Sequence, residues 1–335
     1  MPAALRRLSS ISFSGAGFLT VYHLGVAHCL LENGLIRLEP PTDATTQSPS
    51  IMTGVSGGAL VSSTLICGIP PERSMEILLE VAGKARQQTL NIYHPGYSLI
   101  DAVERHLSTL LSKIDGEEVK ERVRGGRLRI GFTDGRVFPP FGYNPKAYLY
   151  IDSFQTVDDI VAACVLSSYV PGATGPLLSS NVTNQAVQRS QDKLLELAKH
   201  GAVKNFYGTS IQEDVKIAPP IFVDGGFVNV WPVVDADTLI VTPLSAQFHC
   251  RDYICPPCAD SKFFAVNPYT SLAMHYSNVS TLQDMIWSSV DDVLGQRFAQ
   301  GHDNAREFLE KNNLLSQVNV VTAAHRQAKL DNAAN

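Results

Sequence analysis

Short β-branched apolar runs alternate along this chain with longer segments whose apolar residues recur at helical spacing. The runs that predict buried strands lie at residues 8–13, 51–55, 128–132, 147–151, 221–223 and 238–241. The segments that predict helices lie at residues 18–33, 57–67, 74–88, 98–111, 157–167, 184–199 and 307–315. This alternation predicts an α/β fold with a mostly parallel central sheet and helices on both faces.

Polar and glycine-rich segments separate these elements. Gly34 follows the first helix as a predicted C-cap, and residues 39–50, rich in Pro, Thr and Ser, predict a surface loop. The helix at 184–199 is amphipathic, with Val187 and Leu194 on its apolar face. No internal repeat and no linker divides the chain, so the pattern favours one large domain.

Composition and charge narrow the class of protein. Of 335 residues, 44% are hydrophobic and 18% are charged, which is typical of a globular chain. The net charge of −5 gives no general attraction to nucleic acid, so we expect no nucleic-acid partner. No window holds the roughly 18 uncharged apolar residues of a membrane span. Arg6 and Arg7 before apolar residues resemble a weak secretion signal, but cleavage there would remove the glycine-rich loop described below.

Single cysteines in apolar surroundings, such as Cys29 and Cys164, favour reduced thiols and a cytoplasmic protein. Cys255 and Cys258 have the spacing of metal ligands, but no second paired motif accompanies them. We therefore expect crowded thiols in a loop there, and no metal site.

The first candidate for chemistry is the serine in Gly54-Val55-Ser56-Gly57-Gly58, between a predicted strand and a predicted helix. This pattern is typical of a nucleophile elbow, a tight turn that exposes one hydroxyl. Gly54 and Gly58 remove Cβ atoms where the strand and helix crowd each other, and the helix directs its positive end at the reacting carbon. An ordinary Gly-Ser turn is the alternative reading, and the motif alone does not decide between the two.

The second candidate is Gly15-Ala16-Gly17, between the first strand and the first helix. Free backbone amides at a helix start bind anions, and beside an elbow serine the anion is a tetrahedral oxyanion. A dinucleotide site is disfavoured because Thr20 replaces the third glycine of that fingerprint. A tight turn without chemistry is the remaining alternative.

The third candidate is Asp224-Gly225-Gly226, directly after a short strand. A carboxylate there would face Ser56 if the two strands were parallel neighbours, although Asp-Gly also forms simple turns. His249, His275 or His302 would complete an α/β-hydrolase triad in chain order. Because only one strand precedes Ser56, that fold is disfavoured and a Ser–Asp dyad is favoured.

In combination these motifs resemble the patatin-like phospholipase family, in particular its adipose triglyceride lipase and adiponutrin branch. The matching segments are 11–19 (ISFSGAGFL), 22–26 (YHLGV), 54–58 (GVSGG) and 223–226 (VDGG), with further ones at 167–171, 239–245, 254–256 and 304–309. The resemblance spans residues 8–315 and implies one three-layer αβα patatin-like domain, followed by a polar tail at 316–335.

The resemblance also implies roles for the candidate residues. Ser56 would be the nucleophile and Asp224 the general base and acid, with an oxyanion hole at Gly15, Ala16 and Gly17. Gly54, Gly58, Gly225 and Gly226 would support these motifs, and no cofactor is implied. The implied substrates are long-chain acyl esters of glycerolipids, met at a lipid droplet or membrane surface without a transmembrane span.

Two departures from the family pattern affect these expectations. Thr20 stands where the family's loop has glycine, which puts the geometry of the loop and the rate in question. Residues 178–218 form an apparent insertion, interpreted either as a lid or interface segment or as an ordinary packed elaboration. A triacylglycerol lipase is the leading hypothesis; phospholipase A, lysophospholipase or transacylase activity are alternatives, as is a lipid-droplet-binding protein with little turnover.

Overall fold

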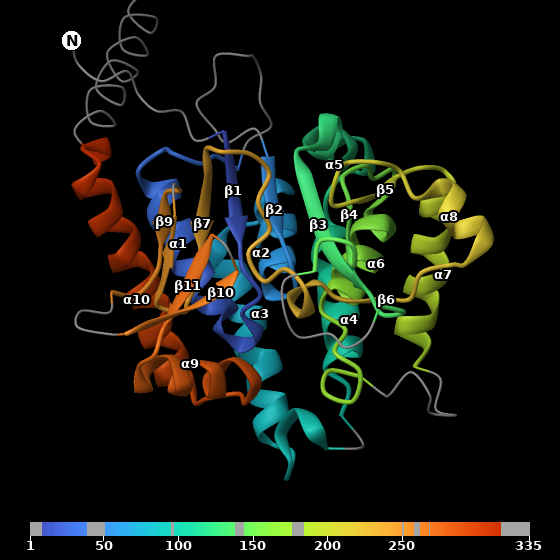
Figure 1. Cartoon of the computed structure of the whole chain (residues 1–335). Coiled ribbons are helices and arrows are strands. Elements are labelled where there is room, and N and C mark those ends of the chain that lie inside the picture. The colour runs from blue at the N-terminus through green and yellow to red at the C-terminus, as the bar shows by residue number, and fades with distance from the viewer. Residues whose placement is uncertain are drawn as a thin grey trace, which may run out of the picture.

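The computed structural model describes residues 9–38, 51–94, 97–137, 144–175, 184–249, 251–257, 262–267 and 269–315 (Figure 1). The loop predicted at 39–50, the tail at 316–335, the first part of the apparent insertion, and Cys258 lie outside these residues. No helix among the described residues has the length and apolarity needed to cross a membrane.

An eight-stranded sheet forms the centre of the molecule, in the order β5-β4-β3-β2-β1-β7-β9, with β6 also paired to β3 (Figure 1). The strands are β1 (Ser10–Phe13), β2 (Ile51–Gly54), β3 (Leu128–Asp134), β4 (Tyr148–Ile151), β5 (Val203–Asn205), β6 (Phe222–Asp224), β7 (Thr238–Val241) and β9 (Tyr253–Ile254). The pairs from β3 through β2 and β1 to β7 and β9 are parallel, whereas β4 and β6 run antiparallel to β3, and β5 antiparallel to β4.

Helices pack around this sheet and give the three-layer αβα sandwich that the sequence predicts. They are α1 (Thr20–Glu32), α2 (Gly57–Ile66), α3 (Pro71–Arg86), α4 (Leu99–Leu111), α5 (Gly116–Val123), α6 (Val157–Ser167), α7 (Gln185–Lys199), α8 (Gln212–Ile217), α9 (Tyr276–Ile286) and α10 (Asp291–Lys311). Fully buried apolar side chains of β1, β3, α1 and α6, such as Phe13, Phe132, Leu24 and Cys164, form the main core between the layers. Burial of such side chains is the dominant source of stability.

Helices α1 and α10 cross in direct backbone contact. A Cβ atom on Gly25 would lie 1.9 Å from the Phe298 carbonyl oxygen, and one on Gly301 would lie 2.1 Å from that of Tyr22. The sequence predicts a helix only at 307–315, whereas α10 already begins at Asp291, so the predicted start of this helix is wrong. The polar first half of α10 buries little besides Leu294 and Gly301, so its apolar spacing is too weak to read.

A second sheet of three antiparallel strands, β8 (Ala246–Phe248), β11 (Thr270–Ala273) and β10 (Phe263–Asn267), was not predicted. Three further helices, α5, α8 and α9, were also missed. These elements are short and half-exposed, so their apolar residues do not form a long periodic pattern.

The apparent insertion contains α7, whose apolar face is packed within the fold. Ala186, Val187, Leu194 and Ala198 are buried, and α7 lies against α6. Gln191 exchanges hydrogen bonds with the backbone of Phe222, at 2.6 and 3.2 Å. This favours the packed elaboration over the lid for the described part of the insertion.

Candidate active site

Ser56 occupies a strained turn between β2 and α2. Its backbone has φ 53° and ψ −130°, a conformation that side chains rarely adopt. The flanking glycines make the turn sterically feasible: a Cβ on Gly58 would lie 2.1 Å from the Phe13 carbonyl oxygen, and one on Gly54 2.3 Å from the backbone of Gly58. The motif therefore forms the elbow geometry that the spacing predicts.

A buried serine that the sequence analysis did not single out holds this turn. The Ser56 amide donates to the Ser167 hydroxyl at 2.9 Å, and that hydroxyl donates to the Gly131 carbonyl at 2.7 Å. Ser167, at the end of α6, thus connects the elbow to β3. Ser167 lies within one of the segments that resemble the family, 167–171, but only its spatial position reveals this role.

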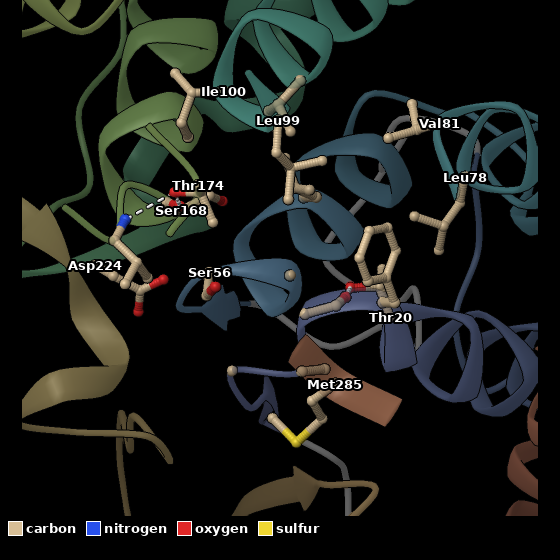
Figure 2. A pocket seen from close by; sticks show the side chains of 18 of the residues that line it. Thr20, Ser56, Leu78, Val81, Leu99, Ile100, Ser168, Thr174, Asp224 and Met285 are labelled. Carbon is tan, nitrogen blue, oxygen red and sulfur yellow. Dashed lines mark hydrogen bonds between the residues drawn. The ribbon is translucent and has the colours of Figure 1, made fainter. Parts of the chain in front are cut away.

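Asp224 reaches Ser56 from a different direction than predicted. Its strand, β6, runs antiparallel to β3, with Asp224 opposite Phe132, so the expected parallel neighbour is wrong. The Asp224 amide donates to the Tyr169 carbonyl at 2.9 Å, and the Thr133 hydroxyl donates to the Asp224 carbonyl at 2.7 Å. These bonds fix the backbone of Asp224 while its side chain faces Ser56 across the site (Figure 2).

Burial changes the acidity of Asp224. Desolvation raises the pKa of its carboxyl from 3.8 to about 6, although the nearby Ser56 hydroxyl and the hydrogen bond from the Gly226 amide act in the opposite direction. The Gly226 amide donates to Asp224 Oδ1 at 2.7 Å and so orients the carboxylate. A carboxylate with this pKa is a stronger base than an ordinary aspartate and is still ionised at pH 7.

The glycine-rich loop lies beside the elbow, and a Cβ on Gly15 would be 3.8 Å from the Ser56 Cβ. The Gly15 amide already donates to the Val230 carbonyl at 3.2 Å, so it is not free for an oxyanion as predicted. Within the described chain, the amides of Ala16, Gly17 and Gly57 have no hydrogen-bond acceptor. Gly57 is the first residue of α2, so these three amides are the available donors at this position.

Thr20 fits into the loop without displacing it. Its hydroxyl donates to the Gly17 carbonyl at 2.7 Å, and a Cβ on Gly57 would lie 2.1 Å from the same hydroxyl oxygen. Thr20 thus packs against the elbow helix and closes the turn with a hydrogen bond. The loop keeps a compact geometry with threonine at this position.

Ser56 and Asp224 open onto an apolar pocket of about 490 Å³ (Figure 2). Its walls come from α2, α3 and α4 and include Leu60, Leu78, Val81, Ile100, Val103 and Leu110. Gly15, Ala16, Gly17 and Gly57 line the same pocket. A pocket of this size with largely apolar walls suits a long hydrocarbon chain.

The three histidines considered for a triad lie elsewhere. His249, His275 and His302 are not among the residues that line this pocket. His275 caps α9, and His302 contacts Glu32 at 2.8 Å. The described geometry therefore brings Ser56 to Asp224 and to none of these histidines.

Serine elbow, aspartate and glycine-rich loop meet at the carboxyl edge of the parallel strands, and this combination defines the patatin class of αβα fold. The profile of the patatin-like phospholipase family matches residues 11–237, and the chain belongs to this family. The resemblance read from the motifs is thereby confirmed.

Several curated proteins are similar over most of this chain. It is 29% identical to mouse 1-acylglycerol-3-phosphate O-acyltransferase Pnpla3, over 92% of this chain and 60% of that protein. It is 26% identical to mouse patatin-like phospholipase domain-containing protein 2, over 94% and 52%, and 24% identical to human patatin-like phospholipase domain-containing protein 5, over 92% and 58%. The chain thus spans between about half and three fifths of the length of these relatives.

Proposed function

We propose that this protein is a serine acyl hydrolase that cleaves long-chain acyl esters of glycerolipids through an acyl-enzyme. The observation that carries the proposal is that the Ser56 side chain and the buried carboxylate of Asp224 face each other in the lining of one apolar pocket (Figure 2). The nucleophile, its base and a site for the acyl chain are therefore in one place, as acyl transfer requires.

The mechanism follows from the positions of these groups. Asp224 accepts the proton of the Ser56 hydroxyl as its oxygen attacks the ester carbonyl, and the tetrahedral oxyanion forms near the free amides of Ala16, Gly17 and Gly57. Asp224 then protonates the leaving alcohol, and the acyl group remains bonded to Ser56. In the second half, water loses a proton to Asp224 and attacks the acyl-enzyme. Asp224 then returns this proton to the Ser56 oxygen as the fatty acid leaves, which restores the free serine and the carboxylate.

Acyl transfer is the second candidate function. The relative at 29% identity carries the name of an acyltransferase that acts on 1-acylglycerol-3-phosphate. The first half of the mechanism is the same, and a lipid alcohol replaces water in the second half. A pocket with largely apolar walls favours such an acceptor over water.

A fluorophosphonate probe and a substrate panel test these proposals. We expect the probe to label Ser56, and triacylglycerol to be hydrolysed faster than phosphatidylcholine or a lysophospholipid. Addition of 1-acylglycerol-3-phosphate would divert the acyl group to that acceptor if transfer dominates. A folded protein without labelling at Ser56 would instead support a lipid-binding protein with little turnover.

We further propose that the protein meets its lipid at an apolar rim beside the pocket. The rim consists of Tyr93 together with Tyr276, Val279, Leu282, Ile286 and Trp287 on and after α9. Each is exposed, from 41% for Tyr93 to 81% for Tyr276. Tyr93 and Ile286 also line the pocket, and the rings of Tyr93 and Trp287 lie 6.4 Å apart. A lipid that moves from a bilayer or droplet into the pocket would therefore pass over exposed apolar side chains.

The rim predicts binding to neutral or zwitterionic lipid, because none of its side chains is charged. We expect Trp287 fluorescence to be quenched by vesicles of brominated phosphatidylcholine, with little effect of salt. Trp231, the other of the two tryptophans, is only 6% exposed, and a Trp231→Phe variant isolates the signal of Trp287.

Replacement of Leu282, which lies on α9 and outside the pocket lining, by aspartate should weaken vesicle binding by at least about tenfold, since a buried aliphatic side chain contributes about 1.5–3 kcal/mol. Ile217→Asp is the matched control, because Ile217 is 86% exposed on α8 and lies outside the rim. Equal vesicle binding by both variants would contradict the rim. Fluorophosphonate labelling of Ser56 in solution should persist in both, which separates docking from chemistry.

A further inference from the structure

A cluster of histidine and carboxylate side chains lies where α1 and α10 meet, on residues that the proposed acyl chemistry does not use. His28 and Glu32 are one turn apart on α1, and His302 comes from α10, 270 positions further along the chain than Glu32. Glu72 on α3 and Asp303 on α10 complete the cluster. From the sequence, a metal is considered only at Cys255 and Cys258 and is not expected there; His28, Glu32 and His302 are scattered along the chain, and only the fold gathers them.

The ligand atoms in this cluster are already close. His28 Nε2 lies 3.2 Å from Glu32 Oε1, and His302 Nε2 lies 2.8 Å from Glu32 Oε2. The candidate ligand atoms of these three residues all lie within 4.8 Å of one another. Bond lengths of about 2.0–2.1 Å around a tetrahedral zinc place neighbouring ligand atoms about 3.3 Å apart. Small rotations of the side chains are enough to converge on one ion.

The outer nitrogens of both imidazoles face further carboxylates. His28 Nδ1 lies 2.6 Å from Glu72 Oε1, and His302 Nδ1 lies 3.7 Å from Asp303 Oδ1. At His28 the distance is that of a hydrogen bond, so Glu72 holds the proton on Nδ1 and directs the lone pair of Nε2 into the cluster. This carboxylate–histidine arrangement is the usual second layer around histidines that bind zinc.

The backbone beneath the cluster is fixed. Gly25 and Gly301 bring α1 and α10 into direct contact about one turn before His28 and beside His302. The rings of His28 and His302 lie 5.7 Å apart at their centroids. A rigid crossing keeps the ligands in place before an ion binds, which lowers the entropic cost of binding.

We propose that His28, Glu32 and His302 bind one Zn²⁺ ion. Two imidazole nitrogens and one carboxylate are a ligand set that zinc accepts, and calcium or magnesium prefer oxygen ligands alone. His28 and His302 are 27% and 28% exposed, so a water molecule has access to the fourth position. The ion would join α1, which begins at the glycine-rich loop, to α10.

The test uses the full chain, freed of metal by chelation and titrated with ZnCl₂ in a calorimeter. We expect one equivalent to bind, and the melting temperature to rise by about 5 °C at a hundredfold excess over Kd. Co²⁺ should give the visible absorption of a tetrahedral site. His28→Gln and His302→Gln should each abolish these signals, and Glu72→Gln should weaken binding about 10–100-fold.

Two further variants make the result specific. His200→Gln is the matched control, because His200 contacts Glu196 at 3.0 Å on α7 with no second imidazole described beside it. Cys255→Ser tests binding at a thiol instead. Zinc binding that survives both His28→Gln and His302→Gln, or that is lost in Cys255→Ser, would overturn the proposal, as would a wild-type protein that binds none. Circular dichroism checks that each variant is folded. If a histidine variant does not fold, the weaker zinc binding expected of Glu72→Gln tests the proposal instead.

Discussion

Ser56→Ala should abolish ester hydrolysis and fluorophosphonate labelling, with a loss of at least about a thousandfold in kcat, while the fold survives. Removal of the nucleophile removes the acyl-enzyme route, and binding and the oxyanion site alone retain little rate. The elbow backbone should persist because its hydrogen bond to Ser167 comes from the Ser56 amide and not from its hydroxyl. Hydrolysis of a short-chain nitrophenyl ester and mass-spectrometric detection of the labelled peptide measure both effects.

Ser62→Ala is the control that separates loss of the nucleophile from a general loss of stability near the turn. Ser62 lies on the same helix, α2, and its hydroxyl donates to the Thr53 carbonyl at 2.9 Å, just before the turn. Its loss should cost about 1 kcal/mol of stability and leave Ser56 reactive. Substantial hydrolysis by Ser56→Ala would show that another group is the nucleophile.

Asp224→Asn should lower kcat about 10²–10⁴-fold and at the same time stabilise the protein at neutral pH. An amide cannot accept the proton of Ser56, so general-base catalysis is lost. The folded-state pKa of about 6 lies above the unfolded value of 3.8, so protonation of Asp224 favours the fold. That contribution is present at low pH and is lost as the pH rises through about 6. At pH 7 the ionised carboxylate costs about 3 kcal/mol, which asparagine would relieve.

The pH profile provides the measurement. In the wild type, kcat/KM should fall as the pH decreases through about 6, where Asp224 gains a proton, and residual activity of Asp224→Asn should not follow this titration. Urea unfolding at pH 7.5 measures the gain in stability.

Asp159→Asn is the control with the opposite sign. Burial raises the pKa of Asp159, but hydrogen bonds from Gln155, Thr156 and Lys193 outweigh burial and lower the pKa. That variant should be less stable than the wild type at pH 7.5, and a loss of stability in Asp224→Asn would contradict the raised pKa.

The sequence predicted the local parts of the site better than the distant ones. Ser56 and its glycines could be identified because an elbow needs small residues at fixed positions in one short segment. The direction of β6 could not be predicted, since a three-residue strand carries no signal of its partner. Ser167 was missed because its contact with Ser56 joins positions 111 residues apart. The free amide of Gly15 was predicted wrongly for the same reason, as its acceptor is Val230.

Helix α9 and the second sheet were missed for a different reason. Their exposed apolar residues, such as Tyr276 and Phe264, do not follow the division between buried apolar and exposed polar positions on which sequence reasoning relies. A surface with a function can keep apolar residues exposed, and predictions from the burial pattern then fail at that surface.

The antiparallel pairing of β6 with β3 affects the order in which the parts of the site come together during folding. The loop, α1, β2 and the elbow belong to neighbouring segments of the chain, whereas β6 pairs with β3 only after a long intervening stretch has closed. Contacts that close long loops form slowly. The Ser56 turn and its base therefore both depend on contacts between distant segments, since Ser167 holds the turn from 111 positions away. A newly made chain would have no activity until both α6 and β6 are in place.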